Sequence, residues 1–355
     1  MAPGKQQRKA TLTSNEQGWP TLLGDNARSG GQPSQTWRAP RRTRWQISLE
    51  GAVRGSPILQ GELLYVPSLA GFLNAINIRS GRLQWRFKAP AAIHSTPSLS
   101  LGRVLFGCDD GKVIAIDAAT GTKSWEVASQ DEVWASPIFQ NESVYFGSAD
   151  GNMYAVRAES GAPQWKQMLG GRIYSSAHVA KRRIYVGCGD GNIYGMDAAT
   201  GQVLWKTATG NGIDCSPAVD RYSVFIGSQD FVFYSLDAGS GAVLWRYEAE
   251  LGISSAPAIS GDLILFGCKA GTLHALDIRT GKMIWKSRIG QAITAPPVIN
   301  GSVVWLQAGF TFALNLSDGR VLWKANLGNS VQSAPVVTKD VVYLAGMEGE
   351  IYALE

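Results

Sequence analysis

The chain has 355 residues, of which 45% are hydrophobic and 17% charged, and it contains 41 glycines and 12 tryptophans. This composition excludes a disordered polar chain, and no apolar run reaches the roughly 18 residues of a transmembrane helix. The net charge of +5 comes from residues 1–44, which hold eight basic and two acidic residues against 25 basic and 26 acidic residues in the remainder. A near-neutral body offers no electrostatic footprint for a phosphate backbone, so we expect no nucleic-acid partner.

Residues 1–17 are polar and basic, and we expect them to form a flexible, solvated tail. They contain neither the apolar core of a signal peptide nor a lipoprotein-type cysteine. The chain as written is therefore expected to be cytoplasmic, and a periplasmic location would require an export signal trimmed from this sequence.

A repeat of about 40 residues organises the rest of the chain. Each repeat ends in a tryptophan, which in six of the eight repeats follows a Thr-Gly or Ser-Gly turn between stretches of alternating apolar and polar residues. Asp-Gly pairs at Asp110, Asp150 and Asp190 mark an earlier hairpin in their repeats. Each repeat thus predicts four strands, the unit of a β-propeller blade, and we expect one domain over residues 18–355 with eight blades. The eight tryptophans are Trp45, Trp85, Trp125, Trp165, Trp205, Trp245, Trp285 and Trp323.

The two ends of the chain complement one another. The last repeat stops at Leu354 without its tryptophan strand, whereas residues 43–49 supply such a strand near the beginning. We expect this N-terminal strand to complete the last blade and close the ring, which leaves no exposed sheet edge. The tryptophans are expected to hold adjacent blades together.

Two neighbouring positions of the repeat differ in kind. The first is β-branched in all eight repeats, as packing between blades favours. The next is different in every repeat, and because side chains alternate along a strand, we expect it to face the central channel. Two residues earlier on the same face, Glu132 and Arg172 are expected to form an ion pair. The variable position holds Arg54, His94, Trp134, Tyr174, Asp214, Ser254, Thr294 and Gln332.

An imidazole, a carboxylate, a phenol, a guanidinium and an indole in one ring predict a site that orients a small molecule or a peptide strand. A hydrated channel mouth without chemistry would also tolerate mixed polar residues. In an enzyme, His94 would be the general acid or base, with Asp214 and Tyr174 as its orienting or relay partners. Arg54 would clamp an anion, and Trp134 would form a stacking wall. Further ligand contacts are expected from Glu132, Arg172, Ser254, Thr294 and Gln332.

The cysteines do not predict a metal site. Cys108, Cys188, Cys215 and Cys268 show no Cys-x-x-Cys spacing and no neighbouring histidine, so we expect free, buried thiols and no bound metal. Of the other histidines, His274 is expected to be structural, and His178 is expected to border the channel.

The segment pattern Ala-x-Asp-x-x-Thr-Gly-x-x-x-Trp, as in residues 115–125 and 275–285, together with residues 18–30, resembles the PQQ-repeat β-propellers. The resemblance covers about residues 18 to 355 and implies an all-β, eight-bladed fold. That superfamily includes quinoprotein alcohol dehydrogenases, the propeller lipoprotein of the outer-membrane β-barrel assembly machine, and sensory proteins. Fold alone does not fix function within such a superfamily. The dehydrogenases carry two adjacent cysteines and a calcium-binding carboxylate set, and this sequence has no adjacent cysteines, so no PQQ or other cofactor is expected.

Three functions stay open. A non-catalytic binding or scaffolding propeller would hold a small molecule or peptide in its central channel, or a protein partner on its loop faces. A cofactor-independent enzyme would use the ring for proton transfer, as a cyclase, lyase or isomerase. A quinoprotein dehydrogenase would require PQQ and calcium.

Overall fold

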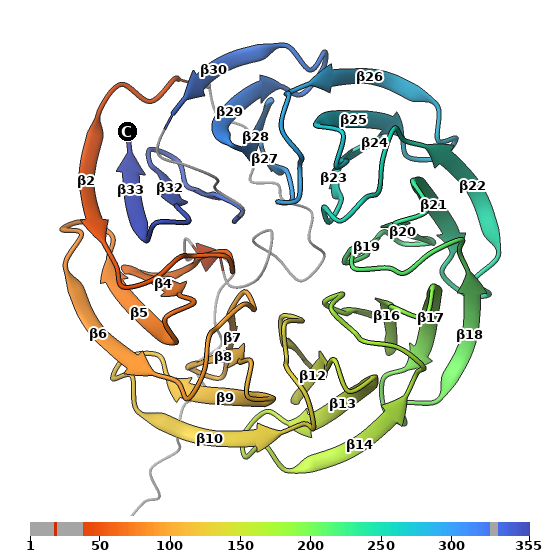
Figure 1. Cartoon of the computed structure of the whole chain (residues 1–355), viewed down its shortest axis with the longest axis horizontal. Coiled ribbons are helices and arrows are strands. Elements are labelled where there is room, and N and C mark those ends of the chain that lie inside the picture. The colour runs from red at the N-terminus through yellow and green to blue at the C-terminus, as the bar shows by residue number, and fades with distance from the viewer. Residues whose placement is uncertain (1–17, 20–37, 327–332) are drawn as a thin grey trace, which may run out of the picture.

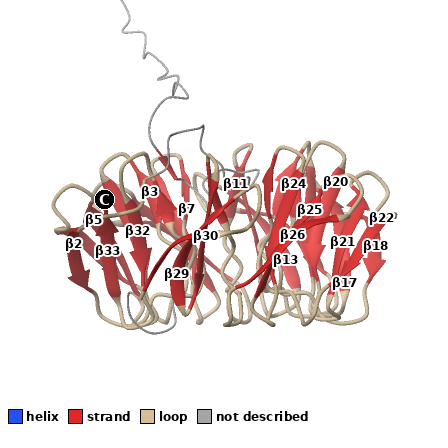
Figure 2. Cartoon of the chain, turned by 90° about the horizontal axis from the view of Figure 1, so that it is seen from above, coloured by secondary structure: helices blue, strands red, loops and turns tan. Residues whose placement is uncertain are grey.

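The computed structural model describes residues 18–19, 38–326 and 333–355, and these form eight β-sheets arranged as blades around a central axis (Figure 1). Seen from the side, the blades form a disc with loops on both faces (Figure 2). No helix within the described ranges is long and apolar enough to cross a bilayer. The expected all-β, eight-bladed propeller is confirmed. The expected tail, residues 1–17, lies outside the described residues.

Blades 1 to 7 run from an inner strand to an outer strand in chain order, and neighbouring strands within each blade are antiparallel. Blade 1 contains β3 (Ile58–Gln60), β4 (Leu63–Pro67), β5 (Phe72–Asn77) and β6 (Leu83–Lys88). Blade 2 contains β7 (Ser98–Ser100), β8 (Arg103–Gly107), β9 (Lys112–Asp117) and β10 (Lys123–Ala128). Blade 3 contains β11 (Ile138–Gln140), β12 (Ser143–Gly147), β13 (Asn152–Arg157) and β14 (Pro163–Met168). Blade 4 contains β15 (His178–Ala180), β16 (Arg183–Gly187), β17 (Asn192–Asp197) and β18 (Val203–Ala208).

The second half of the ring repeats this plan. Blade 5 contains β19 (Ala218–Val219), β20 (Ser223–Gly227), β21 (Val232–Asp237) and β22 (Val243–Glu248). Blade 6 contains β23 (Ala258–Ser260), β24 (Leu263–Gly267), β25 (Thr272–Asp277) and β26 (Met283–Arg288). Blade 7 contains β27 (Val298–Asn300), β28 (Val303–Ala308), β29 (Phe310–Asn315) and β30 (Val321–Ala325). Blade 8 contains β31 (Val336–Val337), β32 (Val342–Ala345), β33 (Glu350–Leu354) and the N-terminal strand β2 (Thr43–Ser48).

The ring closes as the sequence predicts. Strand β2 pairs with β33, with Trp45 opposite Ala353, so the last blade is built from both ends of the chain. The short strand β1 (Gly18–Trp19) pairs with β3 and gives blade 1 a fifth strand, which the sequence did not predict. Buried hydroxyls add a further link across the closure, because the backbone N–H of Ala334 in blade 8 donates to Oγ of Ser56 in blade 1. The same link joins blades 1 to 5, from Ser56 N–H to Thr96 Oγ1 and onward through Ser136, Ser176 and Ser216.

The repeated tryptophans contact the next blade. Trp205, for example, donates its Nε1 hydrogen to the carbonyl of Ala238, and its ring lies against Gly241 in the Ser-Gly turn that follows. Trp323 makes no such hydrogen bond among the described residues, because the matching turn of blade 8 would lie between the two chain ends. Six further tryptophans donate in the same way: Trp45 to Ile78, Trp85 to Ala118, Trp125 to Ala158, Trp165 to Ala198, Trp245 to Ile278 and Trp285 to Leu316.

A cleft of about 880 Å³ marks the closure between blades 7 and 8. It is lined by residues 38–42, which lead into β2, and by residues 337–342, together with Trp305 and Glu355. The cleft lies where a continuous blade would have its turn between the third and fourth strands. Its position therefore follows from the use of two chain ends in one blade.

Candidate functional site

The variable position of the repeat lies in the connection that leads to each inner strand, not in the strand itself. Arg54 precedes the first residue of β3 by four positions, and Pro57 lies between them. Proline has no N–H to donate to a sheet, so the strand begins only after it. The expected alternation nevertheless holds in this extended connection, because Val53 is fully buried while Arg54 is exposed.

The β-branched position packs between blades as expected. Ile213, Ile253 and the other described members of the series have no exposed surface. In five of the described repeats the side chain lies against the glycine that ends the second strand of the preceding blade, such as Gly187 for Ile213 and Gly227 for Ile253. The corresponding strand ends in Pro67 before Ile93 and in Ala345 before Val53. Any side chain at that glycine would displace the β-branched residue. This packing fixes the connection and leaves the next residue on the opposite side of the chain.

Four variable residues from blades 1 to 4 contact one another in sequence, and we call them the aromatic arc: Arg54, His94, Trp134 and Tyr174. The ring centroids of His94 and Trp134 lie 4.5 Å apart with planes 16° apart, and those of Trp134 and Tyr174 lie 4.8 Å apart at 26°. The guanidinium carbon of Arg54 lies 5.4 Å from the Trp134 ring centroid. Arg54 Nη1 is also 3.5 Å from His94 Nδ1. Residues 40 positions apart in sequence thus form one continuous surface.

Asp109 joins two members of the aromatic arc. Its Oδ2 lies 3.4 Å from His94 Nε2, and its Oδ1 accepts a hydrogen bond of 2.8 Å from Trp134 Nε1. Asp109 was not among the residues predicted from the sequence. Asp109 occupies a second position of the repeat that varies between blades, in the turn between the second and third strands. The backbone N–H of Asp109 donates a hydrogen bond to the carbonyl of Ala92, which lies two residues before His94. Comparison of this second position across the repeats would have found it: Leu69, Asp109, Ala149, Gly189, Gln229 and Lys269.

Tyr174 connects the two residues that were expected to form an ion pair. Its hydroxyl donates to Glu132 Oε1 over 2.8 Å and accepts from Arg172 Nη1 over 3.1 Å. The expectation of a direct Glu132–Arg172 pair is wrong, because the phenol of Tyr174 reaches between the two charged groups. The hydroxyl of Tyr174 is therefore held by one acceptor and one donor.

On blades 5 and 6 a polar arc forms from Asp214, Gln229, Ser254 and Lys269. Gln229 Nε2 donates to Asp214 Oδ2 over 3.1 Å and to Ser254 Oγ over 2.8 Å, while Lys269 donates to Gln229 Oε1 over 2.8 Å. Asp214 was expected to be a relay partner of His94, but its described hydrogen bond is to Gln229. Thr294 is half-buried in blade 7, and Gln332 lies outside the described residues.

Burial governs the titration of the aromatic arc. Burial lowers the pKa of His94 below its ordinary value of 6.5, and the charge of Arg54 lowers it further, although Asp109 acts in the opposite direction. Burial and the hydrogen bond to Glu132 raise the pKa of Tyr174 above 10.0. At neutral pH the imidazole is uncharged and the phenol keeps its proton.

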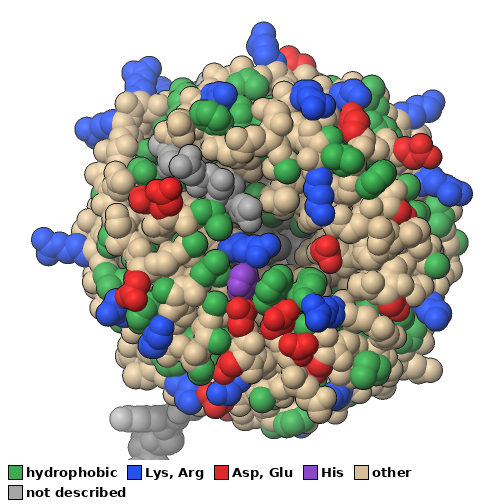
Figure 3. Space-filling view, in the orientation of Figure 1, with side chains coloured by type: hydrophobic (Ala, Val, Ile, Leu, Met, Phe, Trp, Pro, Cys, Tyr) green, Lys and Arg blue, Asp and Glu red, His purple; other side chains and the backbone are tan. Residues whose placement is uncertain are grey.

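The face shown in Figure 3 is hollowed at its centre, and basic, acidic and histidine side chains surround the hollow.

The remaining histidines and cysteines differ in part from expectation. His178 is only 3% exposed within β15, so it does not border the channel as an open side chain. The four cysteines are free and buried, as expected. Cys268 and His274, six residues apart in the sequence, lie close together in space beside Glu250, which follows the last strand of blade 5.

The described residues define an eight-bladed β-propeller with an aromatic arc on blades 1 to 4 and a polar arc on blades 5 and 6. The chain belongs to the family described as outer membrane protein assembly factor BamB, which matches residues 34–172 and 149–355. No curated protein sequence matches it significantly.

Solved structures share the fold at low identity. BamB from Moraxella catarrhalis is 19% identical with a TM-score of 0.77, over 88% of this chain and 99% of that one. The quinohemoprotein alcohol dehydrogenase from Comamonas testosteroni is 16% identical with a TM-score of 0.81, over 95% of this chain and 80% of that one. The computationally designed Ika8 protein is 18% identical with a TM-score of 0.78, over 86% and 98%. At these identities the likeness shows the fold alone.

Proposed function

We propose that this chain is a non-catalytic binding propeller whose aromatic arc holds an extended peptide segment of a protein partner. One observation carries the proposal: Arg54, His94, Trp134 and Tyr174 come from four successive blades and fix one another through stacking and polar contacts. A surface that is ordered before binding loses little conformational entropy when the ligand arrives. Tryptophan, tyrosine and arginine are also the residues that contribute most to protein–protein binding.

The polar contacts of the ring favour binding over proton transfer. Both nitrogens of His94 face charged groups, Nδ1 toward Arg54 and Nε2 toward Asp109, and the hydroxyl of Tyr174 has both a donor and an acceptor. A general base needs a nitrogen or oxygen within hydrogen-bond reach of the substrate proton. In this ring such atoms are already engaged with neighbouring side chains. Their role is to hold the surface in shape.

The chemistry of the ring favours a peptide as the ligand. Three positive groups (Arg54, Arg172, Lys269) and three negative groups (Asp109, Glu132, Asp214) are distributed over blades 1 to 6, so donors and acceptors for backbone amides are both present. A site for a small anion would concentrate one sign of charge. The family is described as an outer membrane protein assembly factor. Because an assembly factor acts on other proteins, this description favours a protein as the partner of this chain.

Site-specific photo-crosslinking tests this proposal. A photoreactive amino acid replaces Trp134 in the full chain, produced in its own cells, and adducts are identified by mass spectrometry. We expect a protein adduct through an extended segment at position 134 and none at Tyr222, which is 64% exposed in the turn between β19 and β20. An adduct with a small molecule, or equal adducts at both positions, would overturn the proposal. The cytoplasmic location stays a prediction, which fractionation of the same cells tests.

A cofactor-independent acid–base enzyme is the second candidate, because His94 and Asp109 form the base-and-orienting-carboxylate arrangement at 3.4 Å. Asp109 thereby takes the place that the sequence analysis gave to Asp214. If a substrate is found, His94→Gln and Asp109→Asn should each lower turnover by about 100-fold, whereas Asp214→Asn should not. Unchanged turnover in the first two variants would exclude this candidate.

The residues present do not fit a quinone cofactor. No two cysteines are adjacent, and the indole of Trp134 is already stacked with two other rings. We therefore expect PQQ with Ca²⁺ to leave the melting temperature unchanged.

A further inference from the structure

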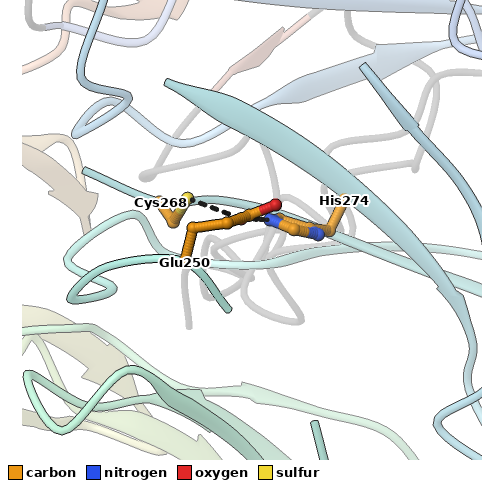
Figure 4. A group of neighbouring side chains, drawn as sticks. All are labelled: Glu250, Cys268 and His274. Carbon is orange, nitrogen blue, oxygen red and sulfur yellow. Dashed lines mark hydrogen bonds and ion pairs between the residues drawn. The ribbon is translucent and has the colours of Figure 1, made fainter. Parts of the chain in front are cut away.

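Three side chains capable of binding a metal meet where the end of blade 5 contacts blade 6, far along the chain from the aromatic arc. Glu250 follows β22, Cys268 follows β24 and His274 lies in β25. His274 Nε2 is 3.0 Å from Glu250 Oε2, and Cys268 Sγ is 3.6 Å from the same oxygen. The three ligand atoms all lie within 4.8 Å of one another, as Figure 4 shows.

The imidazole of His274 is held with Nε2 toward this cluster. Nδ1 lies 3.2 Å from the hydroxyl of Tyr247, and the ring stacks on Phe266 with centroids 5.0 Å apart. The side chain has no exposed surface. Although Nε2 is close to Glu250, it makes no hydrogen bond of acceptable geometry among the described residues. A buried nitrogen without a hydrogen bond is costly unless another group binds it.

Comparison with the other repeats shows which residues differ in blade 6. In blades 3, 4 and 5 the position of His274 is a tyrosine that donates to an aspartate four residues earlier. In blade 6 that aspartate is replaced by Ala270, so His274 has no such partner in its own hairpin. Histidine occurs at this position in no other repeat, and only this repeat combines it with Cys268 and Glu250. The combination is thus not needed to build a blade.

We propose that Glu250, Cys268 and His274 bind one Zn²⁺ ion through a carboxylate oxygen, Sγ and Nε2, with water in the fourth position. Tetrahedral zinc with bonds of about 2.0 Å to nitrogen or oxygen and 2.3 Å to sulfur places its ligand atoms about 3.3 to 3.5 Å apart. The distances of 3.0 and 3.6 Å are close to this range, so small rotations admit the ion. A thiolate, an imidazole and a carboxylate together favour zinc over magnesium or calcium.

The surroundings suit such an ion. Tyr247 fixes the imidazole through Nδ1, as partners of metal-bound histidines do. Lys286 lies 3.0 Å from Glu250 Oε1 and leaves Oε2 toward the cluster. The side chain of Glu250 is 35% exposed, which gives the ion a path from solvent.

Cobalt substitution tests the site. The full-length chain, stripped by a chelator, is titrated with Co²⁺, whose thiolate charge-transfer and tetrahedral d–d bands report sulfur ligation directly. We expect one equivalent to bind, to be displaced by Zn²⁺, and to protect one thiol from alkylation. Zn²⁺ should also raise the melting temperature.

The repeat supplies variants that fit the fold. Cys268→Ser introduces the serine found at the same position in blades 1, 3 and 5, and His274→Tyr introduces the tyrosine of blades 3 to 5. Both should abolish the charge-transfer band, and Tyr247→Phe should weaken Co²⁺ binding about 10-fold or more. The matched control is Cys188→Ser in blade 4, because burial raises the pKa of Cys188 to about 12 and its Sγ faces the Gly171 carbonyl. Absence of a cobalt band in the parent chain, or its persistence in Cys268→Ser, would overturn the proposal.

Discussion

His94 and Trp134 lie face to face, with ring centroids 4.5 Å apart, although they belong to different blades and are separated by 40 residues. Asp109 binds the edge of both rings, through His94 Nε2 and Trp134 Nε1. The contact therefore joins two blades by stacking and by a shared carboxylate. The pKa of His94 should therefore respond to changes in the other residues of the aromatic arc.

Removal of the indole should release His94. In Trp134→Ala we expect the pKa of His94 to rise toward 6.5, because the ring that buries it is lost. The lost stacking should also lower the free energy of unfolding by about 1 to 3 kcal/mol. Titration by NMR and denaturant unfolding measure the two effects. Tyr222→Ala, which removes an exposed aromatic ring elsewhere, should change neither quantity.

Charges beside His94 should move its pKa in opposite directions. Asp109 raises the pKa and Arg54 lowers it, so Asp109→Asn should lower it and Arg54→Gln should raise it. Asparagine keeps an oxygen for Trp134 Nε1, which preserves the stack. The same NMR titration distinguishes the variants, and shifts of equal sign would contradict the described geometry.

Stability should fall in acid because of His94. Its folded pKa lies below the unfolded value of 6.5, so the unfolded chain takes up the proton first as pH falls. Above pH 6.5 there is no effect, and between 6.5 and the folded pKa the free energy of unfolding should decrease by at most about 1.4 kcal/mol per pH unit. Urea unfolding of the parent and His94→Gln across this range measures the difference, and parallel curves would refute it.

The contact between a tryptophan and the next blade can be tested at Gly201. This glycine has φ +75°, and a Cβ there would lie 2.6 Å from the Trp165 ring. Gly201→Ala should cost about 2 to 4 kcal/mol, from both backbone strain and overpacking. Gly261→Ala is the control, since Gly261 has φ +57° but no atom within 4 Å of the added Cβ. Equal losses in thermal unfolding would show that the ring contact contributes nothing.

The hydroxyl of Ser56 accepts a hydrogen bond across the junction between blades 8 and 1. In Ser56→Ala the buried N–H of Ala334 loses its acceptor, which should cost about 1 to 3 kcal/mol. Ser56→Thr should restore stability, because Thr96 fills the same position in blade 2. Chemical denaturation of the three proteins measures this, and a stable Ser56→Ala protein would assign closure to the strand pairing of β2 and β33 alone.

The sequence by itself determined the architecture. The tryptophan period sets the number of blades, and the missing last strand predicts the pairing of β2 with β33. Comparison of one repeat position with the next separated the buried β-branched residues from the variable residues of the ring. Because each of these features occurs in every repeat, the sequence contains several independent examples of it, and local packing rules are enough to predict it.

Only the tertiary structure decided which of the variable side chains meet. Asp109 rather than Asp214 reaches His94, and Tyr174 lies between Glu132 and Arg172, because such contacts depend on the reach of single side chains across blade boundaries. The cluster of Glu250, Cys268 and His274 draws on the end of one blade and the hairpin of the next. The period of the sequence predicts where the backbone of each blade lies. It does not predict which unlike side chains form contacts, because those contacts depend on distances between individual side chains.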